Sequence, residues 1–367
     1  MKVKKKDGHI GGFEAFCLCN YLIYVKMFLA MPRHLIDEAG PVAWAVPLIV
    51  LVFTLVFFYI LTSLLKMFEG LSFLEIAGLL WGTWAQWLLG FLFAAFFVLI
   101  IGLQLRIIGE FLLSTLLPHT PLSAVLFIMV GTFIYLAYFG IENLARLAGL
   151  LFPWLLVAFM VTFLLAMQRG DFYNFAPWLG YGEWRLLVSS VNHIGIYKEI
   201  ILLAFIAPLF RNHQTLQQAG YTSLITLTFF FAFAQAVYIY VFPVHTGAEL
   251  GFPLFQLTRL IYYGTFLQRL DPLFMFVWAS ISIIGMAAGF YVSALSLAQG
   301  AKASDYRPYL FPLAIIVLTI AFFHETSLEA VKAYRTFPAY LAIPIFGLPF
   351  LLWLWALLFH RQRRQRR

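Results

Sequence analysis

Six ionisable side chains lie within long apolar stretches of the sequence, where a charge needs either a partner or water. In hydrocarbon, each one costs roughly 2.5–3.5 kcal/mol unless it is paired or hydrated. Arg106 and Glu110 are four residues apart and share one face of a helix, so they suit either a mutual salt bridge or a polar vestibule. The six residues are Glu14, Lys26, Arg106, Glu110, Lys198 and Glu199.

Lys198 and Glu199 are adjacent, so on a helix they point about 100° apart and cannot share one face. They follow Gly195, in the run NHIGIYKE at 192–199. A glycine beside two charges makes a poor lipid-facing helix, whereas a broken helix exposes backbone groups and lines a cavity. We expect a break near Gly195, with Tyr197 and the two charges facing the cavity. The alternative is a helix that begins near Lys198, with both charges among lipid headgroups.

Lys26 lies deep in the first apolar stretch. We expect its neighbourhood to unwind in symmetry with the break near residue 195, over Tyr24, Val25, Lys26 and Met27. The ammonium of Lys26 either snorkels toward the interface, because Pro32 is close, or faces the same cavity. In the cavity it holds a ligand carboxylate or pairs with Glu199, since an unpaired buried ammonium is too costly.

Trp278, Ser280 and Ser282 stand in a later apolar stretch and complete the candidate ligand-binding residues. The indole would form an aromatic wall and the two serines would supply hydroxyls, although ordinary packing explains Trp278 equally well. Motifs of nucleophilic catalysis, zinc hydrolysis and phosphate binding are absent from the sequence, and its histidines are scattered singly. We therefore expect no enzymatic activity, no catalytic residue, no metal site and no cofactor.

The composition shows which solvent surrounds these residues. Hydrophobic residues make up 63% of the chain and charged residues 11%, against about 25% charged residues in soluble domains. Lipid must therefore cover much of the surface. The net charge of +8 is concentrated in two short basic tails, 1–10 and 361–367. Because these tails adjoin apolar helices, they indicate anionic lipid and membrane topology rather than nucleic acid.

A transmembrane helix needs about 20 mostly apolar residues, and about ten segments of the chain qualify. We expect an all-α polytopic protein that forms a single transmembrane domain over 1–367, and ten helices suit a five-plus-five inverted repeat. Lys and Arg are more frequent on the side of the two tails, which favours cytoplasmic termini. The expected spans are 13–30, 42–65, 84–112, 122–139, 143–167, 187–210, 216–241, 272–298, 308–323 and 338–360.

Three strings carry a resemblance to a known family. They are GIENLARL at 140–147 with Phe152 and Pro153 following, LPHTP at 117–121, and FLQRLDPLF at 266–274 with Trp278 following. In their order and spacing they resemble the B subunits of spore-germination receptors along essentially the whole chain. That family belongs to the amino acid–polyamine–organocation transporter superfamily.

The resemblance implies a membrane subunit of an endospore germinant receptor in the spore inner membrane. Such subunits bind a small germinant, often an amino acid, in a transporter-like cavity, and they assemble with an A-type membrane subunit and a C-type lipoprotein subunit. The alternative is an amino-acid permease that carries out coupled transport. A structural scaffold would need no polar cavity, and Glu14, Lys26, Lys198 and Glu199 argue against it.

The sequence departs from the family in both helices that we expect to be broken. The family usually has glycine in the unwound part of helix one, where this chain has residues 24–27. Glu199 matches a Gly-Glu pattern in helix six, but Lys198 replaces the glycine. Glycine lets the backbone approach a ligand closely, so its absence narrows the expected pocket.

Overall fold

The computed structural model describes residues 10–28, 30–261 and 271–365, with side chains except at 26–28, 271, 273, 337–343 and 359–365. In these ranges the fold is helical, and its single extended pairing is an isolated bridge between Ile10 and Phe210. The longer elements are α1 (Gly12–Phe28), α2 (Met31–Ala39), α3 (Val46–Met67), α4 (Phe73–Trp81), α5 (Thr83–Thr115), α6 (Leu122–Tyr138), α7 (Ile141–Ala166), α8 (Glu183–Asn192), η4 (Ile194–Ile201), α9 (Leu202–Phe205), α10 (His213–Val241), α11 (Val244–Glu249), α12 (Pro253–Arg259), α13 (Asp271–Gly300), α14 (Leu310–Phe323) and α15 (Ser327–Gln365).

Each of the ten predicted spans falls on a helix or on a consecutive group of helices. In the part of the chain that the structure describes, six helical stretches are long and apolar enough to cross a membrane. A bent pair formed by α14 and the start of α15 adds a seventh, and shorter apolar helices lie at Gly12–Val25, Leu122–Tyr138 and Pro344–Leu358. The prediction of an all-α polytopic membrane protein is therefore confirmed.

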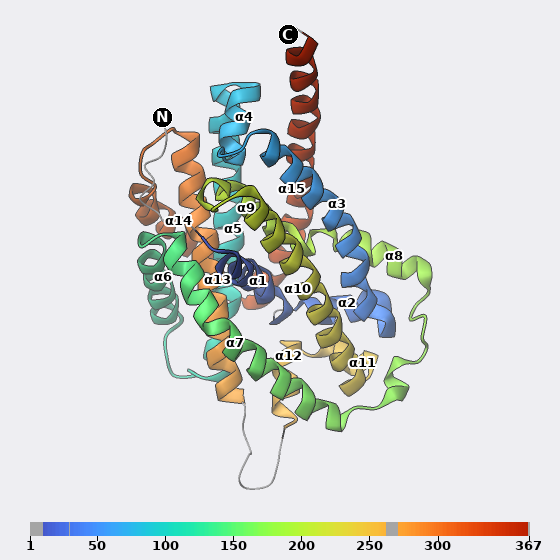
Figure 1. The fold of residues 1–367 in the computed structure, drawn as a ribbon. Helices are drawn as coiled ribbons and strands as arrows, with labels where there is room; N and C mark the ends of the chain where they lie inside the picture. Colours follow the sequence, from blue (N-terminus) through green and yellow to red (C-terminus); the bar gives the residue numbers. More distant parts are fainter. Residues whose placement is uncertain (1–9, 29, 262–270, 366–367) are drawn as a thin grey trace.

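Helices α13 and α5 form the centre of the bundle, and their spans are the most buried, at 89% and 72%. Helix α13 packs against α1, α5, α6 and α7 (Figure 1). Two glycines permit this close approach: a Cβ at Gly285 would lie 2.8 Å from the carbonyl oxygen of Tyr21, and one at Gly90 would lie 2.9 Å from the Cα atom of Gly300. Small residues at such crossings are what allows helices to associate in lipid, where no hydrophobic force drives them together.

Helix six is broken, as the sequence predicted. Helix α8 ends at Asn192, and the chain continues through the 3₁₀ segment η4 before α9 resumes the α-helix. Inside η4, Tyr197 has non-helical angles of φ −108° and ψ 20°, so the sharpest bend lies two residues beyond Gly195. The interpretation in which the helix begins only at Lys198 is wrong, because α8 precedes it.

Helix one is also interrupted, but not where we expected. Residues 24–27 belong to the continuous helix α1, and the discontinuity lies between Phe28 and Met31, where α2 begins. Pro32 explains the position, because its nitrogen cannot donate to the carbonyl of Phe28 and because proline is favoured in the first turn of a new helix. Discontinuous helices of this kind are typical of transporter folds.

Candidate ligand-binding site

The buried charges of η4 lie against helices α5 and α15. The ammonium nitrogen of Lys198 is 5.9 Å from the ring centroid of Phe96 on α5 and 5.8 Å from that of Tyr334 on α15. Both distances are within the range of cation–π attraction, which strengthens where water is excluded. Glu199 is equally buried and interacts electrostatically with Tyr334. The break in helix six therefore presents two opposite charges to one aromatic side chain.

A buried hydrogen bond completes this polar cluster. Gln104 on α5 donates from Nε2 to the hydroxyl oxygen of Tyr334 at 2.9 Å. We use the name inner cluster for Phe96, Gln104, Lys198, Glu199 and Tyr334. Sequence reasoning identified the two charges and missed the other three residues. The sequence contained one signal for them, since Gln104 is an amide in an apolar helix two residues before Arg106.

Tyr197 fixes the bend of η4 instead of facing the inner cluster. Its hydroxyl accepts a hydrogen bond from Thr228 Oγ1 at 2.8 Å and donates to the carbonyl of Pro47 at 3.4 Å. These bonds join η4 to α10 and to the beginning of α3. Gly195 is half-buried in the same segment. The tyrosine was predicted to contact ligand, and that role stays a prediction.

Two predicted residues of α1 face other helices. The ring of Tyr24 packs on Phe159 and Phe230, with centroids 6.2 and 5.1 Å away, and its buried hydroxyl has no hydrogen-bond partner among the described residues. Val25 packs on α13, where a Cβ at Gly285 would lie 3.2 Å from its side chain. The side chain of Lys26 lies outside the described residues, so its pairing with Glu199 or with a ligand stays a prediction.

The predicted residues of α13 diverge from one another. Trp278 is buried and meets Phe111 edge to face, with ring centroids 4.8 Å apart. The hydroxyl of Ser280 donates to the carbonyl of Phe276 at 2.9 Å, so its own helix satisfies it. Ser282 is fully buried, and its hydroxyl has no hydrogen-bond partner among the described residues. The ligand-binding role of these three residues stays a prediction.

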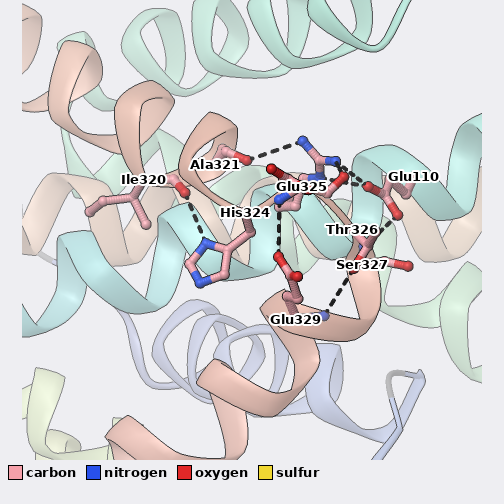
Figure 2. A network of polar contacts seen from close by, with 9 residues as sticks. Glu110, Ile320, Ala321, His324, Glu325, Thr326, Ser327 and Glu329 are labelled. Atoms are coloured by element: carbon pink, nitrogen blue, oxygen red, sulfur yellow. Dashed lines mark hydrogen bonds and ion pairs between the residues drawn. The ribbon is translucent and has the colours of Figure 1, made fainter.

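Arg106 and Glu110 form the predicted salt bridge, and they also hold the turn between α14 and α15. Figure 2 shows Glu110 beside the residues of this turn. Arg106 donates from Nε to Glu110 at 2.6 Å, and its other nitrogens donate to the carbonyls of Ala321 and Glu325. Glu110 accepts the backbone N–H of Ser327 at 2.6 Å. These contacts satisfy backbone groups that a helix end and a helix start leave unpaired. We call this arrangement the α5 clamp.

The α5 clamp matters to the inner cluster because of where α15 begins. Helices α14 and α15 meet at 114°, and Ser327 opens α15 directly after the bend. Tyr334 lies about two turns further along the same helix, so the clamp sets its position relative to Gln104 on α5. Of the two interpretations open for Arg106 and Glu110, the contacts favour the salt bridge over a polar vestibule.

Long apolar helices, a break in helix six and oppositely charged residues buried at that break are typical of a transporter-like membrane protein. Among solved structures, the fold is similar to that of a Na⁺-coupled sialic acid symporter in a substrate-bound outward-open state, with a TM-score of 0.66. The likeness covers 94% of this chain and 79% of the symporter chain at 12% sequence identity, so it concerns the fold alone.

The family model described as spore germination protein matches residues 11–330, and the chain belongs to this family. Its relatives in Bacillus subtilis (strain 168) include spore germination protein KB, 26% identical over 333 residues and 89% of each chain. Proteins B2 and A2 are 20% and 24% identical over 96% of each chain. The resemblance to germination-receptor B subunits is confirmed, and family and fold together define a membrane subunit of a germinant receptor. The relatives include proteins named A2 and B2, and this range of types is consistent with assembly into a receptor complex.

Proposed function

We propose that this subunit binds a small germinant, such as an amino acid, at the inner cluster and has no enzymatic activity. The observation that carries the proposal is the buried pair of opposite charges at the break of helix six. An amino acid carries an ammonium and a carboxylate close together, which complement Glu199 and Lys198 respectively. Backbone groups freed by a broken helix add hydrogen-bonding capacity at the same place.

Tyr334 and Gln104 would orient the ligand. The two side chains already share a hydrogen bond, so their remaining donor and acceptor groups point from fixed positions. The ring of Tyr334 and the ring of Phe96 would cover the apolar part of the ligand. Lys26, if it faces this cluster, either adds a second contact for the carboxylate or neutralises Glu199.

A binding measurement on the protein in lipid nanodiscs tests the proposal. Each of the standard amino acids, radiolabelled, is offered to the unmodified protein, to Glu199→Gln and to Glu142→Gln, which changes a half-buried carboxylate on α7 that pairs with the exposed Arg146. We expect at least one amino acid to bind, and Glu199→Gln to weaken it about tenfold or more, because a hydrogen bond to a charged group is lost. The Glu142→Gln control should bind normally. Binding of none, or equal binding by both variants, would reject the proposal.

A coupled amino-acid permease is the second candidate, and the likeness to a symporter fold favours it. Both candidates would bind the ligand at the inner cluster, but only the permease would carry it across the membrane. Uptake of the bound amino acid into proteoliposomes under a proton or sodium gradient would support the permease. Binding with no uptake would support the receptor.

We also propose an A-type membrane subunit and a C-type lipoprotein subunit as partners, in the spore inner membrane. Both termini would face the cytoplasm. The basic tails support this orientation, as does the contact of Ile10 with Leu209 and Phe210 next to the exposed Arg211. Co-purification of the three subunits from spore membranes tests the partners.

A further inference from the structure

A hollow of about 490 Å³ opens on the surface of the protein where α5 begins and α13 ends. Two indoles contribute to its apolar wall, since the side chains of Trp84 and Trp87 are 68% and 58% exposed. Lys302, two residues beyond the end of α13, is the charged residue of this lining. The lining also includes Thr83, Leu88 and Gly300. The hollow thus combines an apolar wall with one positive charge.

The two helices beside the hollow are held together by small residues and by a buried hydrogen bond. A Cβ at Gly300 would lie 3.3 Å from the Cα atom of Gly90 and 3.5 Å from the carbonyl oxygen of Trp87. Gln86 on α5 donates from Nε2 to the carbonyl of Gln299 on α13 at 2.7 Å. The hollow therefore lies on a closely packed joint, and its lining residues keep their relative positions without a ligand.

The depth of the hollow matches the boundary between hydrocarbon and lipid headgroups. The sequence predicts spans over 84–112 and 272–298, so Trp84 opens one span and Lys302 follows the other by four residues. Trp87 lies about one helical turn inside the first span. Indoles are enriched at this depth, and the ammonium of a lysine reaches into the headgroup layer. The apolar wall therefore faces acyl chains, whereas the cation faces headgroups.

Lys302 adopts a backbone conformation that a lysine rarely takes. Its φ is 54°, in the left-handed region that ends many helices and that glycine usually occupies. From this position its ammonium donates to Oγ1 of Thr83 at 3.1 Å and joins α13 to α5. Among the described residues no carboxylate forms an ion pair with Lys302, because the acid nearest to it in sequence, Asp305, pairs with Arg307. The cation is therefore available to a ligand.

The surroundings of this ammonium favour an anion beside it. Thr83 is the first residue of α5, a helix of 33 residues, and the first N–H groups of a helix carry partial positive charge. An ammonium repels the positive end of a helix, so a negative group that contacts both stabilises both. A phosphate diester has the charge and the acceptor oxygens to contact the ammonium and the hydroxyl of Thr83 together.

We propose that the hollow binds one anionic phospholipid of the surrounding bilayer, with its phosphate at Lys302 and an acyl chain against Trp84 and Trp87. A free anion would use the ammonium and leave the indoles uncovered, whereas a phospholipid contacts both. A zwitterionic phospholipid carries its own cation, which Lys302 would repel, so a net negative headgroup is preferred. The site is distinct from the germinant site, because Phe96 of the inner cluster lies roughly 13 Å further along α5 than Trp87.

Native mass spectrometry of the full chain tests which headgroup is selected. The protein is released from detergent that contains equal amounts of phosphatidylglycerol and phosphatidylcholine with the same acyl chains. We expect the unmodified protein to retain one phosphatidylglycerol, Lys302→Gln to bind it about tenfold more weakly, and Lys302→Arg to retain it. Lys66→Gln is the matched control, because Lys66 is another exposed lysine in the last turn of a helix, α3, and it should retain the lipid normally.

Tryptophan fluorescence locates the acyl chain of the bound lipid. Phosphatidylglycerol with brominated acyl chains quenches indoles on contact and is added as a minor component of phosphatidylcholine nanodiscs. We expect it to quench the unmodified protein more than the double variant Trp84→Phe with Trp87→Phe, and Lys302→Gln should remove this difference. Brominated phosphatidylcholine at the same fraction should show little of it.

Three outcomes overturn the proposal. The first is equal retention of phosphatidylglycerol by Lys302→Gln and Lys66→Gln, which would show that the lysine of the hollow selects no headgroup. The second is equal quenching of the two indoles by both brominated lipids, which would show ordinary contact with the bilayer. The third is an adduct of inorganic phosphate in place of the lipid, which would assign the hollow to a free anion.

Discussion

Replacing Glu110 by Gln should destabilise the protein far more than replacing Glu142 by Gln. The two glutamates offer a matched comparison, because each pairs with an arginine four residues away on its own helix. Their side chains are almost equally exposed, at 24% and 23%. The arginines differ: Arg106 is 8% exposed, whereas Arg146 is 66% exposed. Any difference in the unfolding free energy that the two variants lose therefore comes from the burial of the arginine and from the other hydrogen bonds of each pair.

The magnitude follows from the contacts of Glu110. Its loss leaves a buried guanidinium without its counter-charge, which typically costs 3–5 kcal/mol when a pair is fully buried. Water reaches the exposed edge of Glu110, so we reduce the figure to about 2 kcal/mol. The N–H of Ser327 keeps a weaker acceptor in the glutamine amide. An exposed pair such as that of Glu142 contributes about 0.3–0.5 kcal/mol.

Thermal unfolding of the purified variants, followed by tryptophan fluorescence in one detergent, measures the difference. For a chain of 367 residues we expect the unfolding midpoint to fall by about 2.5 °C in Glu110→Gln and by about 0.5 °C in Glu142→Gln. Hydrogen exchange should localise the loss to the start of α15. Equal shifts in the two variants would refute the reasoning, since the α5 clamp would then contribute no more than a surface pair.

Three further predictions concern the inner cluster and the ends of the chain. Lys26→Ala and Glu199→Gln, made singly and together, should show a coupling energy above about 1 kcal/mol in ligand binding if the two side chains pair, and a value near zero rejects the pair. Tyr334→Phe should cost about 1 kcal/mol of stability, because the amide of Gln104 loses its acceptor, and an unfolding midpoint equal to that of the unmodified protein contradicts this. A cysteine placed in either tail should resist impermeant thiol reagents applied to intact cells, and labelling from outside would overturn the orientation.

The two discontinuous helices show which helix breaks nearby residues predict and which they do not. Near Gly195 the sequence combines a glycine with two charges, and each of these disfavours a lipid-facing helix. The break of helix six was therefore predictable. In helix one the prediction relied on the charge of Lys26, on symmetry with helix six and on the family resemblance, and residues 24–27 contain neither glycine nor proline. The stronger local signal was Pro32, and the discontinuity lies directly before it.

The missed residues of the inner cluster could not be found in the same way. Gln104 and Tyr334 are 230 residues apart, and periodicity shows which face a residue takes but not which helix it meets. The sequence also predicts that Tyr334 lies in a loop between two spans, because Glu329, Lys332 and Arg335 make this stretch too polar for a transmembrane helix. The structure shows why those turns are helical. Thr326 accepts the N–H of Glu329, and Glu110 accepts that of Ser327, so the start of the helix is capped from two sides.

Two buried cations among the described residues, Arg106 and Lys198, differ in the contacts that surround them. Arg106 donates to two backbone carbonyls and to a carboxylate, and such directional bonds fix a single geometry. Lys198 lies near two ring faces, which attract an ammonium without fixing its direction. A directional network suits a joint that must stay closed. We therefore expect the α5 clamp to keep its geometry when a ligand binds at the break of helix six.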